Sequence, residues 1–135
     1  PSEVYHKPAN TFVARFIGAP SMNLLSAKVS GDAISLTGGR RVEVVVSGHE
    51  TGKEVLVGVR PDDLHPDADH PIISGKVSVL EPLGPETLIY VETASGEIIA
   101  KADGRSPPKV GETVNLGAGV EHLHVFDAET GEALS

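Results

Sequence analysis

Residues 30–46 read SGDAISLTGGRRVEVVV, and this stretch predicts an all-β fold. Short runs of aliphatic residues are separated by Ser30-Gly31-Asp32 and by Gly38-Gly39, which are favourable hairpin turns. From Val42 to Val46, valines at alternate positions are expected to share one face of a strand. A repeated pattern of short strand and turn is typical of a β-barrel or a β-sandwich.

The same pattern continues on both sides of this stretch. Apolar runs bounded by Gly, Pro, Asp or Ser predict strands near residues 24–29, 33–36, 41–46, 54–59, 72–80, 87–92, 97–101, 113–116 and 123–126. Ser95-Gly96 is expected to form another hairpin turn. The segment His65–Pro71 is the most loop-like part of the chain, and we expect it to separate two sub-barrels.

The first 18 residues have a different pattern. Pro8 suits the first turn of a helix, and apolar residues follow at helical spacing, namely Phe12, Val13, Phe16 and Ile17. Gly18 and Pro20 supply a stop signal. We therefore predict a short N-terminal helix whose apolar face needs a packing partner, and that partner is expected outside this chain.

Composition limits the possible functions. The 135 residues suit one domain, and aromatic residues make up only 4%, so the core must be built from Val, Ile, Leu and Ala. A formal net charge of -8 opposes binding to nucleic acid. The absence of cysteine excludes disulfides and thiolate sites. No apolar run approaches the roughly 18 to 20 residues of a membrane span, so we expect this chain to be soluble.

No catalytic or cofactor-binding residue is identified. The sequence lacks the phosphate loop Gly-x4-Gly-Lys-Ser/Thr, because Gly52-Lys53 and Gly75-Lys76 are not followed by Ser or Thr. It also lacks a Gly-x-Ser-x-Gly nucleophile elbow. We expect that this chain alone does not hydrolyse ATP.

The six histidines are candidate metal ligands. His122 and His124 would share one face of a strand, and His65 and His70 lie in the loop-like segment. Since spacing fixes no third ligand, surface or strand histidines are favoured and no metal site is predicted. Nucleic-acid binding is also disfavoured, because the predicted strands hold only two aromatic residues on which bases could stack, Tyr90 and Phe126.

Four segments, in order, carry a resemblance to a known family. The first consists of residues 3–5, 8–18 and 20–23 (EVY, PANTFVARFIG and PSMN), and the others are 58–64 (GVRPDDL), 79–87 (VLEPLGPET) and 122–131 (HLHVFDAETG). Together they are similar to the C-terminal third of the ATPase subunits of carbohydrate ABC importers, the family that includes the maltose and glycerol-3-phosphate importers. The resemblance implies a mainly β fold of transport-associated OB-like (TOBE-like) barrels over residues 21–135. Residues 1–20 would form a helical linker from an upstream ATPase domain.

The resemblance also implies a function and partners. The chain would be the regulatory and dimerisation domain of the ATP-hydrolysing subunit of a bacterial sugar or glycerol-3-phosphate importer. It would lie at the cytoplasmic face of the inner membrane, in contact with its own ATPase domain, a second copy, the permease subunits and a possible regulatory protein. ATP and Mg²⁺ would belong to the upstream domain. The residues Phe12, Val13, Phe16 and Ile17 would pack against that domain.

One loop and one arginine are candidates for contact with a second copy or a regulator. In Glu81–Thr87, two prolines stiffen the backbone and a glycine permits a tight bend, and stiff loops can serve as contact surfaces. The candidates are Arg60, Glu81, Pro82, Leu83, Gly84, Glu86 and Thr87. The alternative is that these are structural turn residues.

A second function remains open from the residues alone. Related transport-associated barrels capture oxyanions, which implies a stand-alone small-ligand module as the alternative. Such a site needs converging backbone N–H groups and a few cations. Arg40-Arg41 and Arg60 are the residues that would supply the charge.

Overall fold

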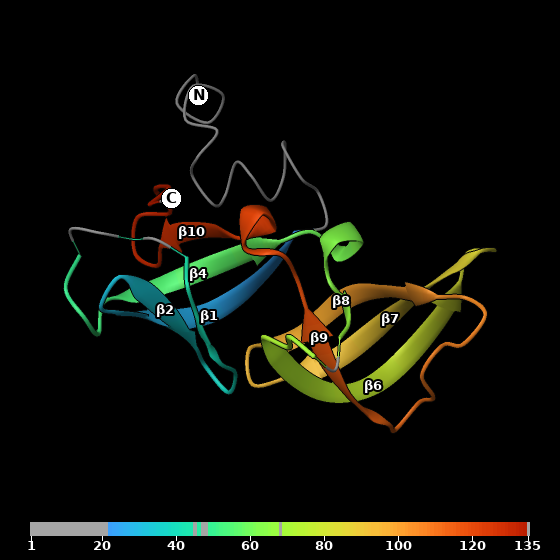
Figure 1. Ribbon diagram of the computed structural model, residues 1–135. Coiled ribbons are helices and arrows are strands. Elements are labelled where there is room, and N and C mark those ends of the chain that lie inside the picture. Colours follow the sequence, from blue (N-terminus) through green and yellow to red (C-terminus); the bar gives the residue numbers. More distant parts are fainter. Residues whose placement is uncertain (1–21, 45, 47–48, 68, 135) are drawn as a thin grey trace, which may run out of the picture.

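The structure is a computed structural model that describes residues 22–44, 46, 49–67 and 69–134. These residues form two five-stranded antiparallel sheets that lie side by side (Figure 1). The first sheet has the strand order β10-β4-β1-β2-β3, and the second has the order β5-β9-β6-β7-β8. The predicted mainly β fold is therefore confirmed. The predicted helix, with Phe12, Val13, Phe16 and Ile17, lies outside the described residues.

The first sheet contains β1 (Asn23–Ser30), β2 (Ala33–Leu36), β3 (Arg41–Val42), β4 (Glu54–Val59) and β10 (His124–Asp127). The second contains β5 (His65–Pro66), β6 (Ile73–Pro82), β7 (Glu86–Thr93), β8 (Gly96–Asp103) and β9 (Thr113–Gly117). The described residues also contain two short 3-10 helices, η2 (Pro61–Asp63) and η3 (Val120–His122). No helix among the described residues is long and apolar enough to cross a membrane.

One predicted strand is shorter than expected. The ladder predicted for 41–46 ends at Val42, where the Val44 N–H donates to the Val42 carbonyl at 2.8 Å. A bond between residues two apart turns the chain out of the ladder. The valines that the alternation places on one side, Val42, Val44 and Val46, are nevertheless all buried, and Glu43 is exposed. The apolar alternation therefore identified the buried face, although it did not fix the hydrogen-bonded strand.

The predicted turns are confirmed. Gly31, Gly38 and Gly96 have φ values of 65°, 66° and 93°, a region that favours glycine. The turn at Gly38 also packs on the second sheet, because a Cβ added there would lie 2.5 Å from the Ala94 Cβ. The next residues continue this contact, since the Arg40 N–H donates to the Ile72 carbonyl at 2.9 Å. The β2–β3 turn thus fastens the first sheet to the second.

The chain passes from the first sheet to the second slightly earlier than predicted. The crossing lies at residues 60–64, and His65 already pairs with Gly117 of β9. The predicted loop-like segment begins with this short strand. The loop that follows is held by the Asp67 carboxylate, which accepts hydrogen bonds from the backbone N–H groups of Asp69 and His70, both at 2.9 Å. Such side-chain capping is a property of Asp in turns.

The second sheet curves until its two ends meet. The Leu64 carbonyl accepts a hydrogen bond from the Lys101 N–H at 3.0 Å, and His65 Nδ1 lies 3.1 Å from the Lys101 carbonyl. These contacts join the β5 end of the sheet to β8 and give it a barrel-like form. The buried residues of both sheets form one connected cluster. Phe126 is the only aromatic residue buried in the described part of the chain, so the predicted aliphatic core is confirmed.

Asn23 joins the two sheets through its side chain. Its amide nitrogen donates to the Ile99 carbonyl and its amide oxygen accepts from the Ile99 N–H, both at 2.8 Å. The Asn23 side chain thereby makes the pair of hydrogen bonds to β8 that a neighbouring strand would make. Since Asn23 is only 7% exposed, its amide needs partners within the protein, and the Ile99 N–H and carbonyl supply both.

Candidate interaction surface

Arg60 stands at the start of a short, well-fixed turn. The Asp63 N–H donates to the Arg60 carbonyl at 3.0 Å and the Leu64 N–H to the Pro61 carbonyl at 3.3 Å. Leu64 is fully buried, so it anchors the turn in the core while Arg60 stays exposed. Proline at the first helical position suits such a turn, because its missing N–H would have no partner there.

The hairpin at residues 81–87 is the tip of β6 and β7. Pro82 pairs with Thr87, and the Leu83 N–H donates to the Glu86 carbonyl at 2.8 Å. Gly84 has a φ of 89°, so the bend uses a conformation that glycine adopts readily. The Gly104 N–H donates to the Pro85 carbonyl at 2.9 Å, which ties the tip to the end of β8.

Most of the predicted contact residues face solvent. Leu83 is 51% exposed and is one of four large apolar side chains that are exposed in the described residues. The other exposed candidates are Arg60, Glu81, Pro82, Gly84 and Glu86. Thr87 differs, because it is only 3% exposed and its side chain lies inside the barrel.

Lys101 connects the Arg60 turn to the hairpin. Its Nζ lies 2.7 Å from Asp62 Oδ1 and 3.6 Å from Glu86 Oε1. The hydrogen bond to Asp62, helped by the charges of Asp62 and Glu86, raises the pKa of Lys101. The same bond lowers the pKa of Asp62. Two segments that the sequence marked separately therefore form one surface, and sequence reasoning missed the lysine that joins them.

A shallow cavity of about 460 Å³ lies beside this connection. Its lining includes Glu86 and Lys101 together with His65, Pro85, Ala102, Asp103 and Arg105. Arg105 pairs with Asp103 at 2.7 Å. Since both cations are paired with carboxylates, the cavity presents balanced charge, as is usual at the polar rim of a protein contact.

Asp127 holds in place the fourth segment of the family resemblance, residues 122–131. Its Oδ1 accepts hydrogen bonds from the N–H groups of Glu129 and Thr130 at 2.8 and 3.0 Å, and its Oδ2 lies 2.7 Å from Lys53 Nζ. The Lys53 hydrogen bond and the two backbone bonds lower the pKa of Asp127 to about 2. This carboxylate therefore fixes the turn after β10 against the segment that leads into β4.

Protonation of Asp127 at low pH should lower the free energy of unfolding. A lowered folded-state pKa gives stability that is present above the usual value of 3.8 and is lost as the pH falls toward 2. We expect Asp127→Asn to flatten this part of the curve of unfolding free energy against pH, measured by urea denaturation at each pH. Asp32→Asn, an exposed aspartate in a turn, is the control and should leave the curve unchanged. Equal curves for Asp127→Asn and the unmodified chain would contradict the assignment.

The histidines are grouped differently from the prediction. His122 belongs to η3 and not to a strand, because its N–H donates to the Gly119 carbonyl at 2.9 Å. It lines a cavity of about 400 Å³ with His65 and His70, while His124 does not. His122 Nδ1 lies 3.7 Å from Asp63 Oδ2. Within the described residues, no group of three or more His, Asp or Glu side chains has the arrangement of a metal site.

The arginines proposed for the alternative do not form one cluster. Arg41 pairs with Glu43, and it also donates to the Ser30 carbonyl at 3.2 Å. Arg60 belongs to the turn that follows β4. Arg40 lines a separate cavity at the junction of the two sheets.

Comparison with known proteins places this fold in a family. The family model described as "TOBE domain" matches residues 57–126, and the one described as "MalK OB fold domain" matches residues 18–64. The molybdate-binding protein ModG, solved with molybdate bound, is 18% identical with a TM-score of 0.60. The alignment covers 81% of this chain and 96% of ModG, and at this identity it shows a shared fold.

Curated relatives share more of the sequence. The chain is 42% identical to the α-glucoside transport ATP-binding protein AglK of Rhizobium meliloti over 94% of its own length. It is 36% identical to the sn-glycerol-3-phosphate import ATP-binding protein UgpC of Cereibacter sphaeroides over 99%. The chain spans 38% of the length of each of these relatives. Because the TOBE match alone covers more than half of its residues, this chain belongs to the TOBE-domain family, with a MalK-type OB fold at its start.

Proposed function

We propose that this chain is the regulatory and dimerisation domain of the ATP-hydrolysing subunit of a bacterial sugar or glycerol-3-phosphate ABC importer. The observation that carries the proposal is the match to two family models together with 42% identity to AglK across almost the whole chain. The names of AglK and UgpC describe ATP-binding proteins for α-glucoside transport and for glycerol-3-phosphate import. ATP and Mg²⁺ would be bound by a separate ATPase domain, because this chain has no phosphate loop.

The same proposal includes the partners and the location. The chain would contact its ATPase domain, a second copy of itself and, through the parent subunit, the membrane permease. It would lie in the cytoplasm against the inner membrane. A regulatory protein is a further candidate partner.

We place the contact with a second copy or a regulator on the Arg60 turn and the 81–87 hairpin. This surface is rigid, since Gly104 and Lys101 hold the hairpin to β8 and Asp62 holds the turn to the same lysine. A preorganised surface loses little conformational entropy on binding. Leu83 supplies an exposed apolar side chain at the tip of the hairpin, and the charged groups of Glu86, Lys101 and Asp62 supply a polar part of the surface.

The reading frame gives the first test of the importer assignment. We expect the coding sequence in front of Pro1 to contain a phosphate loop and an ABC signature in the same frame. A start codon directly before Pro1 would contradict the proposal, because the parent would then lack the ATPase domain.

Substitution of Leu83 tests the contact surface in the full-length parent. We expect Leu83→Asp to weaken the subunit dimer or the response to a regulator by about tenfold or more, because burying a charge in an apolar contact is costly. Val110→Asp is the matched control, since Val110 is 62% exposed and lies outside this surface. Dimer dissociation is measured by analytical ultracentrifugation, and regulation by ATPase rate. Equal effects of the two variants would remove the hairpin from the proposal.

A further inference from the structure

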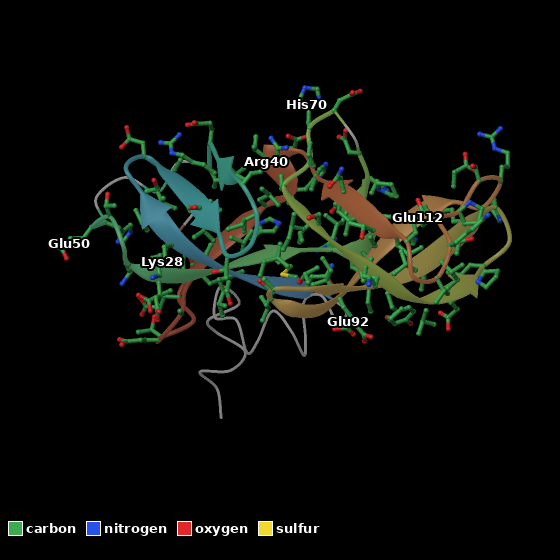
Figure 2. The ribbon with its side chains drawn as sticks, turned by 90° about the horizontal axis from the view of Figure 1, so that it is seen from below. Lys28, Arg40, Glu50, His70, Glu92 and Glu112 are labelled. Atoms are coloured by element: carbon green, nitrogen blue, oxygen red, sulfur yellow. The ribbon has the colours of Figure 1, made fainter. Side chains whose placement is uncertain are left out.

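A small cavity lies where the β2–β3 turn meets the second sheet. Its volume is about 200 Å³, and it is lined by Gly38, Gly39, Arg40, Pro71, Ile72, Ile73, Ser74 and Asn115. The turn is held in place because Gly39 forms a bridge with Ile73 and the Arg40 N–H bonds to the Ile72 carbonyl. Arg40 and His70 lie on the same side of the molecule (Figure 2). The cavity is separate from the Arg60 turn and the hairpin.

Three polar side chains at this cavity have no partner within the described residues. Ser74 and Asn115 are directly opposite each other in the β6–β9 pair, so their side chains share one face of the sheet. Both are exposed, as is Arg40. None of the three side chains makes a hydrogen bond or an ion pair with another residue of the described ranges, so all three are available to a ligand.

The charge of the cavity is unusual for this chain. No carboxylate lines it, whereas Asp63, Asp67 and Glu121 line the histidine cavity, and Glu86 and Asp103 line the one beside Lys101. The whole chain carries a formal net charge of -8. A guanidinium without a carboxylate beside it gives a local positive potential, which favours an anion.

The geometry distinguishes between kinds of anion. A tetrahedral dianion is held best by several converging N–H groups, but the Gly39 and Arg40 N–H groups already donate to the Leu36 and Ile72 carbonyls. A single guanidinium presents a planar fork that matches two oxygens of a carboxylate or of a phosphate. Without those N–H groups it balances only one negative charge, which favours the carboxylate. The volume is below the roughly 300 Å³ at which small-molecule pockets begin. The cavity therefore suits an end group rather than a whole sugar or nucleotide.

We propose that this cavity binds a carboxylate carried on a short aliphatic stem. The Arg40 guanidinium binds the carboxylate, and Ser74 and Asn115 donate further hydrogen bonds to it. Pro71, which is half-buried and lines the cavity, contacts the stem. The chemistry is that of a glutamate side chain or of a free dicarboxylate such as glutarate, and this site does not depend on the importer assignment.

The test is an NMR titration of the ¹⁵N-labelled chain. The probes are N-acetyl-glutamate N-methylamide, its glutamine counterpart, and glutarate. We expect saturable shifts of the Arg40 Nε–H and the Asn115 side-chain amide with the glutamate probe at millimolar concentration, and none with the glutamine probe. Arg40→Gln should weaken binding by about tenfold or more, because the charge-assisted bonds are lost. Arg41→Gln, which changes the neighbouring arginine that is paired with Glu43, should leave it unchanged.

Each arm of the titration has a defined meaning. Tighter binding of glutarate than of the glutamate probe supports the site and assigns it to a free dicarboxylate. Equal binding supports the site and assigns it to an acidic side chain. Three results would each overturn the proposal. The first is equal shifts with the glutamine probe, and the second is an unchanged affinity in Arg40→Gln. The third is saturation by phosphate or molybdate at a lower concentration than by either carboxylate. Because Arg40 is exposed, Arg40→Gln should fold, which a ¹⁵N spectrum of the variant checks directly.

Discussion

Gly75→Ala is expected to lower the free energy of unfolding by about 3 kcal/mol, the upper part of the range for overpacked sites. A Cβ at this position would lie 2.2 Å from the Glu92 carbonyl oxygen and 2.8 Å from the Val91 Cγ1. The nearest obstacle is a backbone atom of β7, which cannot rotate away as a flexible side chain would. The two strands must therefore move apart at Gly75, which weakens the packing of β6 against β7 there.

Urea denaturation followed by far-UV circular dichroism measures this loss. Ser74→Ala is the matched control, since it adjoins Gly75 in the same strand and its side chain is exposed. We expect it to change the free energy of unfolding by less than about 0.5 kcal/mol. A loss below about 1 kcal/mol in Gly75→Ala would show that β6 and β7 can move apart at little cost, and would contradict the close approach.

Asn23→Ala is expected to cost about 3 kcal/mol. The substitution removes two hydrogen bonds of 2.8 Å and leaves both the N–H and the C=O of Ile99 without a partner in a partly buried place. A buried polar group without a partner costs about 1 to 3 kcal/mol. The alanine also leaves unfilled the space that the amide occupied between the sheets.

Hydrogen exchange of the Ile99 amide reports this contact directly. In Asn23→Ala, we expect its protection to fall by more than that of other β8 amides. Ser95→Ala is the control, because the Ser95 hydroxyl also accepts a bond between the sheets, from the Ser26 N–H at 3.0 Å, but at an exposed site. Its expected cost is below about 1 kcal/mol. If the two variants are equally destabilised, the Asn23 amide has no special role.

The elements whose conformation is set by residues adjacent in the sequence could be predicted from the sequence. The turns at Gly31, Gly38 and Gly96 follow from glycine's tolerance of positive φ, and the strands follow from apolar runs between such turns. The four segments of resemblance also identified the family correctly, because each is a local sequence motif that needs no knowledge of the fold.

The contacts that organise the surfaces could not be predicted in this way. Asn23 and Ile99 are 76 residues apart, and no local pattern records that one side chain meets the other backbone. Lys101 appears in the sequence as an ordinary strand residue, yet it joins Asp62 to Glu86. Arg40, Ser74 and Asn115 come from a turn and from two strands. Such sites depend on which strands pair across the fold. That pairing is set by the register of the strands and by the closure of the sheet.

The outer edge of β8 has a consequence for how these molecules can associate. An open edge strand offers unpaired N–H and C=O groups that can recruit a strand from another molecule and begin aggregation. Here Ile99 gives both groups to the Asn23 side chain, and the Lys101 N–H bonds to the Leu64 carbonyl. This edge is closed to intermolecular β-pairing at those positions. At Ile99 and Lys101, two copies could therefore recognise each other only through side chains.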